Sequence, residues 1–157
     1  MTTKIGFGAD HAGFELKEYL RSELKKQGFE TVDYGTHSTE AADYPDFAEA
    51  VGDAVRQGKV ELGIIVCGSG VGASVAANKV PGVRAGLCHD VFSARQGRED
   101  DDTNVLCLGS RVIGPSLALE VAKAFVQAKF SKLDRHVRRL NKVLAIENKY
   151  MDKAASG

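Results

Sequence analysis

Short apolar runs alternate with amphipathic segments along the whole chain. Five of these runs have the length and composition of strands, at 4–7, 30–34, 62–67, 83–88 and 104–108. The segments around them carry apolar residues at helical spacing or begin with helix-start signals, at 13–27, 46–56, 76–78, 91–98, 115–129 and 131–154. Regular alternation of strand and helix predicts an α/β protein.

Two of the expected strands, GIIVC and NVLCL, carry apolar residues on both faces. Strands of this kind are buried on both sides, as in a parallel sheet that is covered by helices. We therefore predict a five-stranded parallel sheet in a three-layer α/β/α sandwich of the Rossmann-like kind. No repeat or linker interrupts the pattern, so residues 1–157 are expected to form a single domain with a frayed tail at 153–157.

The charge balance bears on possible partners, and the apolar runs and cysteines bear on the compartment. Among 157 residues, 21 Lys and Arg balance 21 Asp and Glu, so nothing in the total favours a nucleic acid or a membrane surface as partner. There is no apolar run of eighteen residues, and MTTKIGFGAD leads directly into a strand-like segment, so we expect a cytoplasmic protein. The three cysteines lack CxxC spacing and are expected to be free thiols.

Chemistry is expected beyond the carboxyl ends of the strands, where open parallel sheets bind ligands. Polar residues and glycines follow four of the five strands there, as the segments 8–11, 67–72, 88–90 and 109–111. One crevice at this edge of the sheet would collect them all.

The strongest signal is the run C-G-S-G-V-G at 67–72. Its glycines allow the backbone to turn sharply into a helix, and its free N–H groups would face a ligand anion. A thiol beside such amides is biased toward the thiolate, so Cys67 is a candidate acid/base group. The alternative is a small buried hydrophobic residue, which is how we interpret Cys88 and Cys107.

Other patterns carry weaker signals. The glycine run has neither G-x-G-x-x-G nor G-K-[ST], which makes a nucleotide-binding, flavodoxin-like module the last choice. His11 and His89 fit no metal-ligand spacing, and no metal is expected. Arg135 and Arg139 lie four residues apart, on one helix face, where they would grip a phosphate together; a merely solvated face is the alternative.

The sequence resembles the ribose-5-phosphate isomerase B / galactose-6-phosphate isomerase family nearly from end to end. The blocks that carry the resemblance are G-A-D-H-A-G-F-x-L-K, D-Y-P-D-F-A, V-C-G-S-G-V-G-A-S-V-A-A-N-K-V-P-G-V-R-A, D-T-N-V-L-x-L-G-S-R-V-I-G and R-H-V-R-R. The resemblance implies an aldose–ketose isomerase without metal or other cofactor, acting on a small sugar phosphate. Ribose 5-phosphate and ribulose 5-phosphate are the default pair.

The resemblance also implies roles for individual residues. Cys67 would move the proton between C2 and C1 through an enediolate, with Ser69 assisting. The backbone amides of the loop would hold the enediolate oxygen, and Arg135 and Arg139 the phosphate. The other implied substrate contacts, including the loop residues, are Asp10, His11, Tyr44, Gly68, Gly70, Val71, Gly72, His89, Asp101 and Arg111.

One position departs from the family pattern. Where these isomerases typically have the histidine that opens the sugar ring, this chain has Asp100. Asp100 with a raised pKa, or His89, would replace that histidine, or the substrate needs no ring opening. A tetrose phosphate cannot close a furanose ring, so it is an alternative substrate beside galactose 6-phosphate.

The resemblance implies, finally, a homodimer or homotetramer with the site at the subunit boundary. It also leaves open an alternative of another class, a non-catalytic sugar-phosphate-binding subunit that works with an unlike partner. The intact Cys67 loop argues against that alternative.

Overall fold

The computed structural model describes residues 2–156, and the side chains of 2–151 among them. Its centre is a five-stranded sheet in the order β2-β1-β3-β5-β4. All four ladders are parallel, which confirms the predicted sheet. The strands are β1 (Lys4–Ala9), β2 (Glu30–Asp33), β3 (Leu62–Cys67), β4 (Ala85–Leu87) and β5 (Val105–Gly109).

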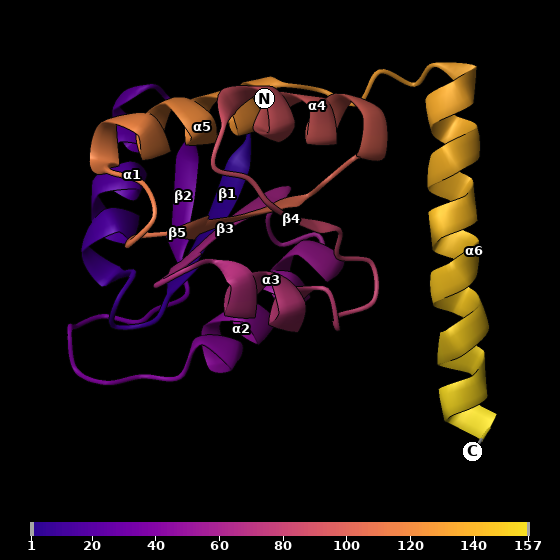
Figure 1. The fold of residues 1–157 in the computed structure, drawn as a ribbon, viewed down its shortest axis with the longest axis horizontal. Helices are drawn as coiled ribbons and strands as arrows, with labels where there is room; N and C mark the ends of the chain where they lie inside the picture. Colours follow the sequence, from indigo (N-terminus) through magenta and orange to yellow (C-terminus); the bar gives the residue numbers. More distant parts are fainter. Residues whose placement is uncertain (1, 157) are drawn as a thin grey trace.

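Helices cover both faces of the sheet, as the three-layer sandwich requires (Figure 1). Three of them, α1 (Phe14–Lys26), α4 (Val91–Asp101) and α5 (Pro115–Gln127), bury their apolar residues in one core cluster. On the opposite face, α2 (Tyr44–Arg56) and α3 (Val71–Ala77) pack into a second cluster. None of the helices within 2–156 is long and apolar enough to cross a membrane.

Side chains of β3 alternate between the two clusters with the period of two that a strand imposes. Ile64 and Val66 face α1 and α5, whereas Ile65 and Cys67 face α2 and α3. Both sets are buried, which explains why the strand shows no polar positions. Cys67 therefore ends the strand on the side of α2 and α3.

Several element boundaries differ from those expected from the sequence. The fourth strand covers only Ala85–Leu87, so Cys88 lies just after it, and α4 continues three residues past 98. The last helix, α6 (Asp134–Ser156), begins three residues later than expected. There the Ser131 hydroxyl accepts the Leu133 N–H at 3.2 Å, which uses 131–133 as a turn before the helix. The predicted frayed tail at 153–157 falls where side chains are not described, and it stays a prediction.

Helix α6 stands beside the body of the molecule, next to the β4 edge of the sheet (Figure 1). Polar contacts attach it to the body at two levels along its length. His136 Nε2 lies 3.4 Å from Asp100 Oδ1 at the end of α4, and Glu147 Oε1 accepts the Gly82 N–H at 3.0 Å. The helix thus crosses the sheet edge from the α4 side to the α3 side.

The chain reverses its direction of progress across the sheet between β1 and β3. From β1 it moves first to β2 on one side, then returns to β3 on the other. Helices leave such a pair of strands on opposite faces, which opens a crevice beyond their carboxyl ends. Ala9 pairs with Val66 at this point, so the residues after β1 and those after β3 lie side by side.

Candidate active site

The sulfur of Cys67 lies against the glycine loop that follows β3. Gly70 donates its N–H to Cys67 Sγ at 3.1 Å, and Gly70 has φ +82°, a left-handed conformation that favours glycine. The cysteine side chain is 4% exposed. Its thiol is thus sheltered and touches a backbone donor at the carboxyl edge of the sheet.

Ser69 and Gly72 shape the outer side of this loop. The Ser69 hydroxyl is on the exposed side and accepts the Val71 N–H at 3.2 Å. The Tyr44 ring lies directly over Gly72, since a Cβ there would be 2.2 Å from Tyr44 Cε1. Glycine at 72 is therefore required for the first residue of α2 to cover the loop.

The segment after β5 is attached to the same loop. Cys67 and Gly68 accept the backbone N–H groups of Ser110 and Arg111 at 2.9 and 3.0 Å. The Arg111 guanidinium is exposed, with Nη1 3.4 Å from the position that a Cβ of Gly68 would take. A cation thus lies beside Gly68 of the glycine loop.

Asp10 and His11 come from the neighbouring strand end. The Asp10 N–H donates to the Val66 carbonyl at 3.3 Å, and its Oδ1 accepts the Gly13 N–H at 3.0 Å, which fixes the turn into α1. His11 is exposed, and its Nδ1 lies 3.1 Å from the Ala42 backbone nitrogen. Both residues therefore border the crevice between β1 and β3.

His89, after β4, also reaches this edge. Its Nε2 accepts the Gly109 N–H at 2.8 Å, so the neutral ring carries its hydrogen on Nδ1. With one nitrogen used in this way, the ring is suited to donating a hydrogen bond from Nδ1. A proton-transfer role would require Nε2 to give up its bond to Gly109.

Asp100 and Asp101 lie at the other end of the molecule. They form the last turn of α4, which starts at the carboxyl edge and runs back along the sheet by about 15 Å to the start of β5. Asp100 accepts a hydrogen bond from Gln96 Nε2 at 2.7 Å and pairs with His136. One chain therefore does not bring these carboxylates to its own Cys67 loop.

Arg135 and Arg139 are separated from the loop in the same way. Both are exposed in the first turns of α6, and neither makes an ion pair with any side chain among residues 2–151. The helix that carries them lies beyond the β4 edge, past two strands from β3 (Figure 1). The two arginines thus lie near each other on α6, as expected, but they do not lie next to the Cys67 loop of the same chain.

Of the remaining cysteines, Cys107 is buried as expected, whereas Cys88 lies after β4 and is only half-buried. Burial raises the pKa of the Cys107 thiol well above its ordinary range, with Cys67 and Cys88 adding to the effect. Burial also raises the pKa of Cys88, and Asp90 adds to it. Among the described residues, no group of three or more His, Cys, Asp or Glu is placed to hold a metal ion.

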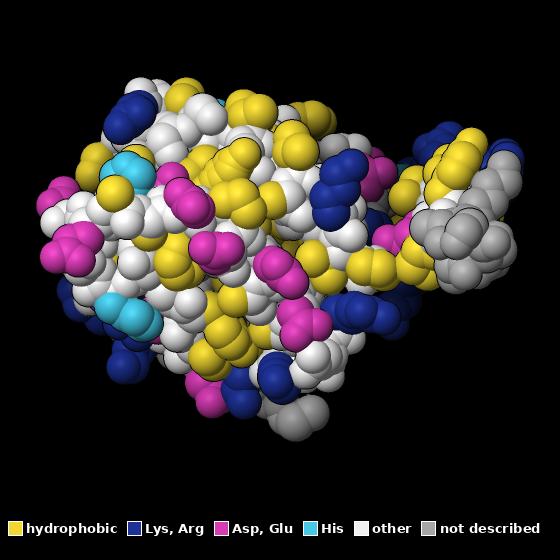
Figure 2. Space-filling view, turned by 90° about the horizontal axis from the view of Figure 1, so that it is seen from below, with side chains coloured by type: hydrophobic (Ala, Val, Ile, Leu, Met, Phe, Trp, Pro, Cys, Tyr) yellow, Lys and Arg dark blue, Asp and Glu magenta, His cyan; other side chains and the backbone are white. Residues whose placement is uncertain are grey.

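A hollow of about 680 Å³ lies elsewhere, between α2 and α3. Figure 2 looks onto this face and shows a row of acidic side chains across it. Asp46, Glu49 and Asp53 line the hollow, against Arg56 and Lys79. A rim with more acids than bases disfavours a phosphorylated ligand, whereas the Arg111 guanidinium favours one at the loop.

Sequence reasoning missed Lys17, which is fully buried and 2.7 Å from Asp33. Lys17 occupies a place in the apolar stripe of α1, one turn before Leu20 and two before Leu24, where a hydrophobic residue is the rule. A lysine at such a position is the signal that would have found it.

The chain is similar to known proteins over most of its length. A family model described as Ribose/Galactose Isomerase matches residues 5–143. Ribose-5-phosphate isomerase B of Escherichia coli K12 is 45% identical over 146 residues, which are 93% of this chain and 97% of that protein. D-erythrulose-4-phosphate isomerase of Pectobacterium atrosepticum is 42% identical over 127 residues, 80% of this chain and 84% of the relative.

Solved structures agree with the sequence comparisons. A structure of Clostridium thermocellum ribose-5-phosphate isomerase B superposes with a TM-score of 0.91 at 47% identity. The superposition covers 94% of this chain and 99% of the other. The predicted Rossmann-like α/β sandwich is therefore the fold of these isomerases.

Proposed function

The chain belongs to the ribose/galactose isomerase family and is an aldose–ketose isomerase, and from this premise we propose that it interconverts ribose 5-phosphate and ribulose 5-phosphate at the Cys67 loop. The observation that carries the proposal is the contact between Cys67 Sγ and the Gly70 N–H at the carboxyl ends of the neighbouring strands β1 and β3. It puts a nucleophilic side chain and a row of amide donors at one place.

The reaction moves one hydrogen between two carbons of an open-chain sugar. The Cys67 thiolate takes the proton from C2 of the aldose and becomes a thiol, which then gives the proton to C1, so the thiolate is regenerated. The electron pair left on carbon moves to the carbonyl oxygen, and the amides of Gly68, Gly70 and Gly72 stabilise the resulting enediolate. Ser69, Asp10 and His11 would bind the sugar hydroxyls and shuttle their protons.

Proton exchange tests the assignment directly. In deuterated water the wild type is expected to incorporate deuterium at C2 of the aldose, and Cys67→Ala to lower exchange and turnover at least about a thousandfold. Cys88→Ala is the control, since that thiol lies outside the loop. Undiminished exchange in Cys67→Ala would show that another group is the base.

We further propose a homodimer in which Arg135 and Arg139 of one copy bind the phosphate in the site of the other. Within one chain these arginines and the Cys67 loop lie on different sides of β4. Apolar side chains are exposed in both places, Val143 and Ile146 on α6, and Val71 and Phe92 near the loop. Their burial between two copies would bring the arginines to the thiol and Asp100 and Asp101 toward the same crevice.

A tetrose phosphate is the second candidate substrate. Asp100 stands where a ring-opening histidine is expected, and it is already paired with Gln96 and His136. A relative at 42% identity is named as a D-erythrulose-4-phosphate isomerase. A panel of ribose 5-phosphate, galactose 6-phosphate and erythrulose 4-phosphate separates the candidates through kcat/KM. If ring opening limits the wild type, Asp100→His should raise kcat/KM for the two sugars that form rings, ribose 5-phosphate and galactose 6-phosphate, and not for erythrulose 4-phosphate.

We place this enzyme in the cytoplasm. Cys67, Cys88 and Cys107 are free thiols, which suits a reducing compartment. Neither nucleic acid nor membrane is proposed as a partner, and no cofactor enters the reaction.

A further inference from the structure

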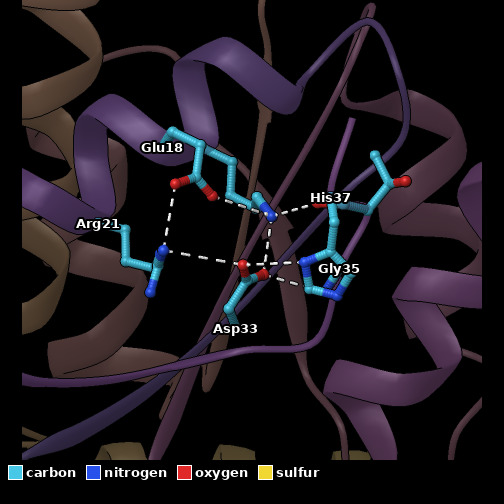
Figure 3. Close-up of polar contacts among 7 residues, drawn as sticks. Glu18, Arg21, Asp33, Gly35 and His37 are labelled. Carbon is cyan, nitrogen blue, oxygen red and sulfur yellow. Dashed lines mark hydrogen bonds and ion pairs between the residues drawn. The ribbon is translucent and has the colours of Figure 1, made fainter. Parts of the chain in front are cut away.

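A charged cluster lies under the segment that connects β2 to α2, residues 34–43. Lys17 of α1, with no exposed surface, is 2.7 Å from Asp33 Oδ1 and also donates to the Thr36 carbonyl. Figure 3 shows Asp33 at the centre, facing Arg21 of α1 and also Gly35 and His37 of the connecting segment. Its contacts with them are 3.8 Å to Arg21 Nη2, 2.9 Å to the Gly35 N–H and 3.4 Å to His37 Nδ1.

A fully buried ammonium is costly unless its partners are well placed. Lys17 has three of them, the Asp33 carboxylate, the Thr36 carbonyl and Glu18 Oε1 at 3.3 Å. Glu18 belongs to α1 like Lys17 itself, but the contacts with Asp33 and Thr36 depend on where residues 33–36 run. The ammonium and this stretch of backbone therefore fix each other.

The connecting segment is also attached at its far end, and there the partner is a candidate substrate contact. After Thr36 it crosses exposed residues up to Ala42, whose backbone nitrogen lies 3.1 Å from His11 Nδ1. Two residues later begins α2 with Tyr44, whose ring covers Gly72 of the catalytic loop. The path from Lys17 through the segment thus ends on two residues of the crevice.

We propose that Lys17 is a positioning residue of the isomerase: by holding Asp33 and the Thr36 carbonyl it sets the course of residues 34–43, and these orient His11 and Tyr44 for the substrate. The catalytic part of this statement rests on the proposed function. The positioning part is independent of it, because it concerns the order of a backbone segment.

Two variants separate positioning from stability. Lys17→Met leaves Asp33 without its nearest cation and is expected to destabilise the fold. The double variant Lys17→Met with Asp33→Leu removes both charges, and a well-packed apolar pair of this kind is often as stable as the ion pair. Lys4→Met is the matched control, because Lys4 pairs with Glu30 at the other end of the same strands, 3.5 Å apart and exposed.

We expect the double variant to melt close to the wild type, yet to lose order and activity. Amide exchange at Thr36 and Ala42 should accelerate about tenfold or more, since the Thr36 carbonyl and the Gly35 N–H have lost their side-chain partners. The value of kcat/KM should fall at least about tenfold. His11→Ala should add little to that loss, because the lysine acts through His11. Lys4→Met should change neither quantity more than about twofold.

Two results overturn the inference. One is wild-type exchange at Thr36 and Ala42 in the double variant. The other is a His11→Ala effect that multiplies fully with the double variant, which would mean that the lysine has only a general structural role. Failure of the proposed function looks different: His11→Ala and Cys67→Ala would then keep turnover, while the exchange measurement still reports on the segment.

Discussion

At the scale of single residues, the site depends on close approaches that tolerate no extra atom. Gly72 is the clearest case, because the Tyr44 ring occupies the space of a Cβ. Gly109 is similar, since a Cβ there would be 2.5 Å from the Ser69 carbonyl oxygen. Gly72 in the loop and Gly109 at the end of β5 therefore do more than allow a turn: they let the loop, α2 and β5 approach one another closely.

Gly72→Ala is predicted to push the Tyr44 ring off the loop. We expect a loss of about 1–3 kcal/mol in the free energy of unfolding, measured by urea titration, and a fall in kcat/KM. Tyr44→Ala in the same chain should remove the clash and restore much of the stability. Gly114→Ala is the control, because nothing lies within 4 Å of its Cβ position, and as the N-cap of α5 it should lose no more than about 1 kcal/mol. A Gly72→Ala protein as stable as this control would contradict the account.

The lowered pKa of Asp33 predicts that the stability of the fold depends on pH. Partial burial opposes its ionisation, but the hydrogen bonds from Lys17 and Gly35 and the charges of Lys17 and Arg21 prevail, so its pKa is lowered from the usual 3.8. A carboxyl with a lower pKa in the folded state stabilises the fold above its unfolded pKa, and this contribution is lost as the pH falls through the folded value.

Asp33→Asn should therefore lower Tm at pH 7 by about 2–8 °C. This difference in Tm from the wild type should shrink progressively as the pH falls below about 4. Melting curves of the two proteins from pH 7 to pH 2.5 measure the difference. Glu30→Gln, which removes the exposed partner of Lys4, should shift Tm little at any pH. A difference between Asp33→Asn and wild type that stays constant down to pH 2.5 would show that the ionised carboxylate is not responsible.

At the scale of secondary-structure elements, the apolar runs were sufficient to predict the sheet but not where helices stop. The residues at 99–101 are Glu-Asp-Asp, which have no apolar member to extend the pattern, yet α4 includes them. Gln96 and His136 bind Asp100 there, and Arg98 binds Asp102 at 3.1 Å. These contacts involve side-chain geometry and a second helix, which periodicity does not encode.

The positions of the candidate site residues could likewise be predicted only in part. Residues after β1, β3 and β5 were expected to meet because parallel strands share one carboxyl edge, and Asp10, Cys67 and Arg111 do lie there. Arg135 and Asp100 were attributed to the same site from the resemblance alone. Chain order could not show that Asp100 lies at the far end of α4 and Arg135 beyond β4, because that depends on which way α4 and α6 run.

At the scale of the whole molecule, the residues proposed for the site lie in separate parts of a single chain. Arg139, Val143 and Ile146 follow one another at spacings of four and three along α6, so they share one exposed face. The proposed dimer pairs this face with the loop of a second copy. Each complete site would then need one Cys67 and the arginines of the other chain.

Mixing two inactive variants tests this arrangement. Cys67→Ala supplies intact arginines, and Arg135→Ala with Arg139→Ala supplies an intact thiol, so each homodimer should be nearly inactive. After subunit exchange at equal amounts, half of the dimers are mixed and each has one complete site, which predicts about a quarter of the wild-type turnover. If the arginines served their own chain, every site would lack one component and mixing would restore nothing. Light scattering of each variant, showing dimers throughout, is the control that makes a negative result meaningful.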